Sequence, residues 1–168
     1  MIRNLLQRSW RFGLLPFIPL LGGLDRPDLY LIPLKGTGTG SRLTGTATLT
    51  PARSPFGLST TRDGHFVFEV AIVVPVLPQA TAFSASATTL VAWVASADLS
   101  HVERIGPVVP GVTTRGKVAM TKFMIVISAE PNAAGVKWTG PIVMRGNSAS
   151  SYLTNFSGHT MFNGGVPQ

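Results

Sequence analysis

The chain has 168 residues, of which 45% are hydrophobic and only 12% are charged, and its formal net charge is +7. This length suffices for one domain with a sizeable core, and the lack of cysteine excludes disulfides, thiolate nucleophiles, iron–sulfur ligation and blue-copper sites. The positive charge forms no Lys/Arg run and no aromatic-interleaved RNA-binding signature, so nucleic acid is not expected as a partner. Abundant Gly and Pro with scattered Thr, Ser and Val favour short strands and turns.

The first 24 residues form an arm that begins basic and continues apolar. Arg3, Arg8 and Arg11 precede the uncharged run FGLLPFIPLLGGL. This order is similar to that of a secretory signal peptide, but no small-x-small cleavage site follows, so the arm is expected to remain attached. The apolar run is shorter than the ~20 residues that span a bilayer, and Pro16 and Pro19 would break a regular spanning helix.

Three roles are open for this arm: an interfacial membrane anchor, a strap in the groove of a partner, and packing on its own domain. Apolar residues at its start fall at helical spacing beside the arginines, which predicts a short basic amphipathic helix. We expect membrane or partner contact, because a terminus this apolar and Pro-rich needs another surface to hold it in one conformation. Arg and aromatic side chains dominate binding hot spots, and the contact residues expected here are Arg3, Arg8, Trp10, Phe17 and Phe162.

An extended connector and a hinge follow the arm. Residues 25–34 (DRPDLYLIPL) contain one short predicted strand at 29–32, and residues 35–40 (KGTGTG) are expected to be flexible. The glycines of this hinge do not predict a phosphate-binding loop, because no Gly-Lys-Ser/Thr and no strand–helix context accompany them. We therefore assign residues 1–40 to the arm and linker.

From residue 41 onward, strand signals recur between turns. Residues 43–50 alternate Thr with apolar or small residues, and residues 65–74 (HFVFEVAIVV) place Phe66, Phe68, Val70 and Ile72 on one face. An Asp-Gly turn precedes this second strand. Further strands are predicted at residues 90–95, 102–105, 117–121, 122–129 and 142–145. About seven short antiparallel strands with regular turn signals predict an all-β sandwich over residues 41–146.

The stretch with the most information is residues 127–146, ISAEPNAAGVKWTGPIVMRG. A strand ends in Glu-Pro, a short Ala/Gly/Lys loop follows, and Thr-Gly-Pro leads into another strand. This order resembles the C-terminal signature of the anti-sigma-K factor family, and residues 64–78 and 90–106 resemble other strands of that family, with Trp93 in the place of its core tryptophan. The resemblance covers about residues 41–146 and implies an extracytoplasmic β-sandwich without catalytic chemistry.

The chain departs from that family in what surrounds this region. In the family that this chain resembles, full-length proteins join a cytoplasmic zinc-type sigma-binding domain through a transmembrane helix to such a sandwich. This sequence contains no His/Cys cluster for zinc, so sigma-factor binding has no residues here to carry it. The last part, residues 147–168 (NSASSYLTNFSGHTMFNGGVPQ), is expected to be an irregular polar tail whose aromatic and Met residues are held by a neighbour.

Metal binding is weakly supported by the sequence. The three histidines His65, His101 and His159 lack ligand spacing such as His-x-His. A soft copper site would have to combine the His159-Thr-Met stretch with Met120 and Met124. A surface histidine beside the aromatic and Met residues of the tail is the simpler interpretation, and no metal or other cofactor is expected.

The carboxylates also show no catalytic pattern. Asp63, Asp98, Glu103 and Glu130 fall in predicted loops or at strand ends, and no Ser-His-Asp arrangement follows from their spacing. Glu130 precedes a proline and is expected to end a strand, where its carboxylate would accept backbone N–H bonds. The sequence therefore does not predict an enzyme.

These observations predict a non-catalytic accessory subunit that braces a larger protein complex on the extracytoplasmic (periplasmic) face of a bacterial membrane. The arm, residues 1–34, and the tail would wrap neighbouring subunits around a rigid sandwich, with no small-molecule substrate. Electron-transfer assemblies, respiratory or photosynthetic, are the hosts expected first. The alternatives are a regulatory sensor module related to anti-sigma factors and, third, a copper-binding protein.

Overall fold

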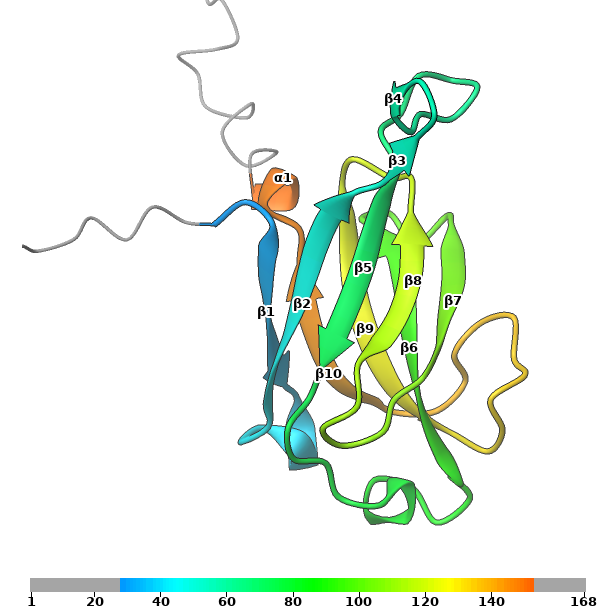
Figure 1. Cartoon of the computed structure of the whole chain (residues 1–168). Helices are drawn as coiled ribbons and strands as arrows, with labels where there is room; N and C mark the ends of the chain where they lie inside the picture. The colour runs from blue at the N-terminus through cyan, green and yellow to red at the C-terminus, as the bar shows by residue number, and fades with distance from the viewer. Residues whose placement is uncertain (1–27, 153–168) are drawn as a thin grey trace, which may run out of the picture.

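The structure is a computed structural model that describes residues 28–152, and this part of the chain is almost entirely antiparallel β-structure (Figure 1). Two 3-10 turns, Gly38–Gly40 and Ala80–Ala82, and one short helix, α1 (Ala149–Tyr152), are the other elements within these residues. The prediction of an all-β antiparallel fold is confirmed. The strands are β1 (Leu31–Gly36), β2 (Thr44–Pro51), β3 (Arg53–Ser54), β4 (Gly57–Leu58), β5 (Phe68–Val73), β6 (Thr89–Ser96), β7 (Val102–Pro107), β8 (Thr114–Val118), β9 (Phe123–Glu130) and β10 (Ile142–Asn147).

Eight of these strands form one sheet in the order β7-β6-β9-β10-β1-β2-β5-β8, and its two end strands come together. The hydroxyl of Thr114 in β8 donates to the carbonyl of Pro107 in β7 at 2.8 Å. Gly116 faces Ile105 so closely that a Cβ there would lie 2.7 Å from the isoleucine Cγ2. The twist of the strands has thus rolled the sheet until it is nearly a barrel, where the sequence predicted a sandwich of about seven strands (Figure 1).

β2 and β5 alternate buried and exposed residues, as strands do when one face meets the core and the other meets solvent. Ala47 and Leu49 of β2 point inward between exposed threonines. Val70 and Ile72 of β5 also point inward, between exposed or half-buried neighbours. The strands predicted at residues 43–50 and 65–74 correspond to β2 and β5, although β5 begins only at Phe68. Phe66, which was expected on the same inner face, precedes β5 and is 55% exposed.

β6 and β9 are buried on both faces, which explains why their sequences are nearly continuous apolar runs. Their inward residues join the barrel core, while their outer faces, including Trp93 and Val126, form a second cluster with Ala133 and Trp138. The loop of residues 131–141 covers the sheet here. Trp93 is therefore buried, but it lies under this loop and outside the barrel interior.

β1 has a more central place than the sequence indicated. It lies between β10 and β2, and its residues Ile32 and Leu34 are fully buried in the barrel core. The segment 35–40, expected to be a flexible hinge, contains the end of β1 and a 3-10 turn, and Thr37 Oγ1 donates to Ile142 O at 2.7 Å. The β-structure thus begins before residue 41, because alternate apolar residues of the connector complete the core.

Two further features of the described residues complete the fold. β3 and β4 form a separate hairpin between β2 and β5, and the sequence did not predict it. β8 lies at Thr114–Val118 instead of the predicted residues 117–121. Within residues 28–152, no helix has the length and apolar character needed to cross a membrane.

Candidate functional site: an apolar end cavity

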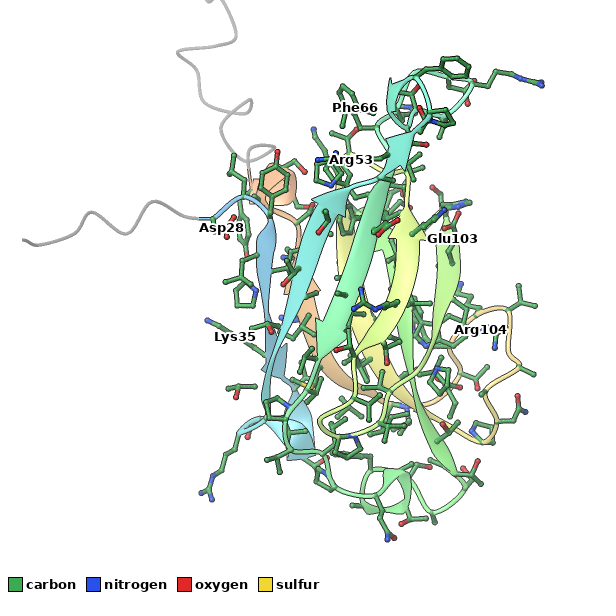
Figure 2. All side chains as sticks on the ribbon, viewed as in Figure 1. Asp28, Lys35, Arg53, Phe66, Glu103 and Arg104 are labelled. Carbon is green, nitrogen blue, oxygen red and sulfur yellow. The ribbon has the colours of Figure 1, made fainter. Side chains whose placement is uncertain are left out.

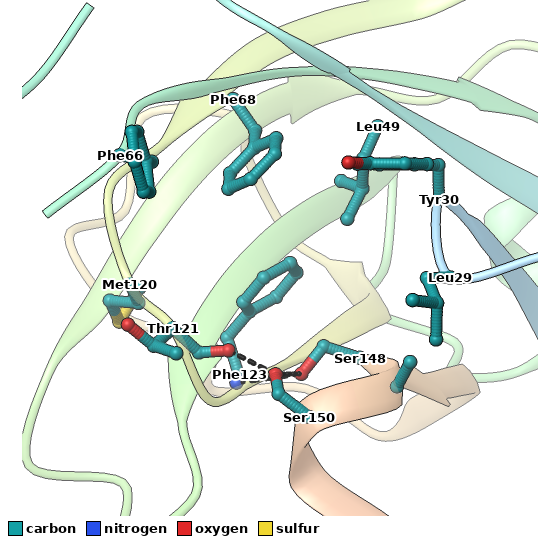
Figure 3. Close-up of a pocket in the computed structure, with 11 residues that line it drawn as sticks. Leu29, Tyr30, Leu49, Phe66, Phe68, Met120, Thr121, Phe123, Ser148 and Ser150 are labelled. Carbon is teal, nitrogen blue, oxygen red and sulfur yellow. Dashed lines mark hydrogen bonds between the residues drawn. The ribbon is translucent and has the colours of Figure 1, made fainter.

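The β3–β4 hairpin and α1 lie at the same end of the barrel (Figure 1). This end contains an apolar cavity of about 330 Å³ (Figure 3). We call it the end cavity. It lies between the beginning of β1 with the adjacent ends of β2 and β5 on one side, and β9 with α1 on the other. The apolar and aromatic side chains that line it are Leu29, Tyr30, Leu49, Phe66, Phe68, Met120, Phe123 and Ala149.

The hydroxyl groups that line the end cavity form hydrogen bonds with other residues of its wall. Ser148 Oγ accepts a hydrogen bond from the backbone N–H of Phe123 at 3.1 Å and lies 3.2 Å from Ser150 Oγ. Ser150 Oγ in turn donates to the carbonyl of Thr121 (Figure 3). No charged side chain is among the described residues that line the cavity. A ligand would therefore be recognised by apolar and aromatic contacts and not by charge.

The apolar surface continues from the end cavity onto the rim. Leu29 is 63% exposed, Phe66 is more than half exposed, and the rings of Tyr30 and Phe68 lie 6.2 Å apart. Beyond them, Phe56 stands at the tip of the β3–β4 hairpin and is 99% exposed. Large exposed apolar side chains that gather at one end of a domain mark an interaction surface more often than a solvated face.

The sequence does not predict this cavity, because its walls come from five separated segments. The starts of β1, β5 and β9, the end of β2 and the residues after β10 meet only when the sheet is rolled. The signal present in the sequence is the apolar character of strand ends such as Leu29-Tyr30 and Phe66-Val67-Phe68. Nothing in a single sequence indicates that these ends lie on the same side.

A buried polar cluster surrounds Glu130 at the end of β9. Its carboxylate is 3% exposed and accepts hydrogen bonds from the backbone N–H groups of Thr139 and Gly140, both at 3.1 Å. The hydroxyls of Thr139 and Ser128 also donate to it. The expectation that Glu130 ends a strand and accepts backbone N–H bonds is confirmed. The carboxylate fixes the end of loop 131–141 to β9.

Burial and these hydrogen bonds together set the pKa of Glu130. Burial alone would raise the pKa of this carboxyl group, but the hydrogen bonds from Ser128, Thr139 and Gly140 outweigh burial and hold the pKa below its ordinary value. A general acid at neutral pH would need a raised pKa. The cluster is thus suited to holding a loop in place.

Glu130→Gln is expected to lower the free energy of unfolding by about 2 kcal/mol at neutral pH, because one amide N–H₂ then faces backbone donors. The pKa of Glu130 is lower in the folded protein than in the unfolded chain. The ionised carboxylate therefore stabilises the fold at pH values above the unfolded-state pKa, and this stabilisation is lost as the pH falls through the folded-state pKa. The difference between wild type and variant should therefore shrink below pH 4.5. Urea unfolding measured over a pH series checks this.

The matched control for this prediction is Glu103→Gln, because Glu103 is an exposed carboxylate whose partner is His101 at 2.7 Å. Exposed pairs of this kind contribute little, so the control should unfold close to wild type at neutral pH. Equal losses in the two variants would contradict the role assigned to Glu130.

The remaining predicted carboxylates do not converge on one site. Asp98 lies in the β6–β7 hairpin, where the hydroxyls of Ser96 and Ser100 lower its pKa to about 2. The imidazole of His101 faces Glu103 on the surface. The serines thus pair with Asp98 and the histidine pairs with Glu103, so the hairpin holds turn contacts and shows no nucleophile–base pair.

The proposed copper ligands that the structure describes point to different places. Met120 lines the end cavity, whereas Met124 packs beside Trp93 in the second cluster, on the outer face of the sheet. His159 and Met161 lie outside the described residues. Within residues 28–152, no group of three or more His, Asp or Glu side chains is arranged to hold a metal ion. The five expected contact residues Arg3, Arg8, Trp10, Phe17 and Phe162 also lie outside the described residues.

Comparisons of the chain with protein-family models, curated proteins and solved structures found no match. The resemblance to the anti-sigma-K family therefore rests on the sequence motifs alone.

Proposed function

We propose that this protein is a non-catalytic accessory subunit that binds a subunit of a bacterial membrane protein complex through the end cavity and its rim. The observation that carries the proposal is an uncharged cavity of about 330 Å³ whose apolar lining continues onto exposed side chains. Interfaces between subunits have such an apolar, aromatic centre, and charged residues are depleted there.

The rim supplies the side chains that such an interface needs. Leu29 and Phe66 stand at the mouth of the end cavity, with Arg53 of β3 nearby at the same end of the barrel (Figure 2). Aromatic and Arg side chains are enriched among hot-spot residues. The rolled sheet behind them provides a rigid support, which limits the entropy that is lost on binding.

The location and the host are part of the proposal. The basic and apolar arm, residues 1–24, supports attachment at a membrane surface, and the anti-sigma-K resemblance supports the extracytoplasmic face. An electron-transfer complex is the proposed host.

A pull-down of the tagged full chain from native membranes in a gentle detergent tests the proposal. The double variant Leu29→Asp/Phe66→Asp places charges on two exposed rim residues and should reduce recovery of partner subunits by roughly tenfold or more. The control, Val136→Asp, changes a residue that is 87% exposed on loop 131–141 and should recover the partners at wild-type levels.

The identity of the recovered proteins decides the outcome. Stoichiometric membrane subunits that carry cofactors, present with wild type and the control but lost with the rim variant, would support an accessory subunit. A sigma factor or its regulator would overturn the proposal in favour of a regulatory module. Recovery of the protein alone, or equal recovery with the rim variant, would overturn it as well.

A further inference from the structure

We infer that, in the free protein, the end cavity is a binding site for the chain's own N-terminal apolar segment, residues 12–24 (FGLLPFIPLLGGL). This inference rests on the proposed function, since it takes the end cavity as the partner-binding site. It adds which ligand fills that site before a partner arrives. Three observations carry it: the length of the connection, the chemistry of the two surfaces, and the size of the cavity.

The connection between the segment and the cavity is short. Leu29 lines the cavity, and Leu24, the last residue of the segment, precedes it by only five positions. Five residues reach at most about 18 Å even when fully extended. The end of the segment therefore stays close to the mouth of the cavity, and a short tether gives an effective concentration on the order of millimolar. A free partner would have to compete with this local concentration.

The chemistry of the segment matches that of the cavity. The segment has no charged residue and no polar side chain, and the cavity has no charged lining residue among those described. The segment also contains Pro16-Phe17-Ile18-Pro19, and Pro-x-x-Pro sequences bind to aromatic-lined grooves in extended form because they have little chain entropy to lose. The cavity offers such a surface in Tyr30, Phe66, Phe68 and Phe123.

The size of the cavity is compatible with the sequence of residues in the segment. About 330 Å³ is at the lower end of the range for ligand pockets, so it admits a few apolar side chains and not the whole segment. In the sequence, Gly22 and Gly23 separate the Pro-x-x-Pro sequence from Leu29 of the cavity. Glycines allow the chain to reverse direction, so Phe17 can turn back toward the cavity.

The consequence is competition between two uses of one segment. Residues 12–24 cannot fill the end cavity and contact a membrane or partner at the same time. A partner that uses the cavity must displace them, which lowers its apparent affinity by the fraction of molecules with an open cavity. The displaced segment then becomes available to contact the partner or the lipid surface.

Cysteine cross-linking in the full chain tests this inference, and the natural sequence contributes no background because it contains no cysteine. Phe17→Cys/Thr121→Cys places one thiol in the segment and one at the cavity wall. We expect an intramolecular disulfide under mild oxidation, formed at least about tenfold faster than in the control pair Phe17→Cys/Val136→Cys. Val136 lies on loop 131–141, and it is not among the cavity residues.

A second measurement detects occupancy without a cross-link. Phe17→Asp in the full chain should release the segment and raise the fluorescence of added anilinonaphthalene sulfonate several-fold, because this probe binds exposed apolar surface. Circular dichroism should show an unchanged β-structure. Adding Leu49→Asp, which places a charge in the cavity wall, should abolish the increase; Thr121→Trp, which fills space at the mouth, is a second blocking variant if the first does not fold.

The outcomes separate this inference from the proposed function. If Phe156→Cys/Thr121→Cys cross-links and the Phe17 pair does not, the C-terminal tail is the ligand and the inference is overturned. If neither pair cross-links while Leu29→Asp/Phe66→Asp still loses its partners, the inference fails and the proposed function stands. If the Phe17 pair cross-links but the rim variant keeps its partners, the cavity serves the segment alone and the proposed function fails.

Discussion

Replacing Trp93 with alanine is expected to lower the free energy of unfolding by about 4 kcal/mol. The indole is 1% exposed and fills the space between the outer face of the sheet and loop 131–141. Its Nε1 donates to Ser128 Oγ at 2.9 Å, and its ring packs edge-on against Trp138 with 6.3 Å between centroids. The substitution would leave a void and also remove a donor from the polar cluster around Glu130.

Urea unfolding followed by far-ultraviolet circular dichroism would measure this effect without depending on tryptophan emission. Trp93→Phe keeps much of the ring volume but removes the N–H, so it should cost roughly 1–2 kcal/mol. Val136→Ala, an exposed change in the same loop, should cost nearly nothing. A Trp93→Ala variant as stable as wild type would show that packing of the loop on the sheet does not stabilise the fold.

Gly140→Ala is the second change expected to have a large effect, at about 3 kcal/mol or more. A Cβ at this position would lie 1.8 Å from the carbonyl oxygen of Ala129 and 2.9 Å from its carbon, and both are backbone atoms of β9. Relief requires the loop to move away from the strand. That movement would break the hydrogen bond from the N–H of Gly140 to Glu130 and the bond from Ala129 N to Pro141 O.

Gly135→Ala provides a matched control, since it is the same substitution in the same loop. The closest atom to its Cβ would be the carbonyl oxygen of Lys137 at 3.2 Å, and a shift of a few tenths of an ångström relieves that contact. The control should lose less than about 1 kcal/mol. Amide hydrogen exchange would locate the difference, with increased exchange in residues 131–141 for Gly140→Ala alone. Similar stabilities for the two variants would contradict the close packing of Gly140 on β9.

The strand content of this protein follows from local sequence, because side-chain periodicity reports which faces of a strand are buried. The alternation of Thr with Ala47 and Leu49 predicts β2, and the apolar runs that include Trp93 and Val126 predict two more strands, which the structure buries on both faces. Glu130 could be assigned to a strand end from the proline that follows it. These predictions need only neighbouring residues.

Strand order and the end cavity were decided by tertiary structure. The place of β1 at the centre of the sheet depends on its pairing with β10, which is distant in the sequence, as well as with β2, which follows it in the chain. The closure of the sheet depends on the close approach of Gly116 to Ile105. Leu29, Phe68 and Phe123 form one cavity only because this closure brings the ends of their strands together. Local periodicity in a sequence indicates which residues prefer burial. A surface built from separate strands forms only when long-range pairing brings those strands side by side.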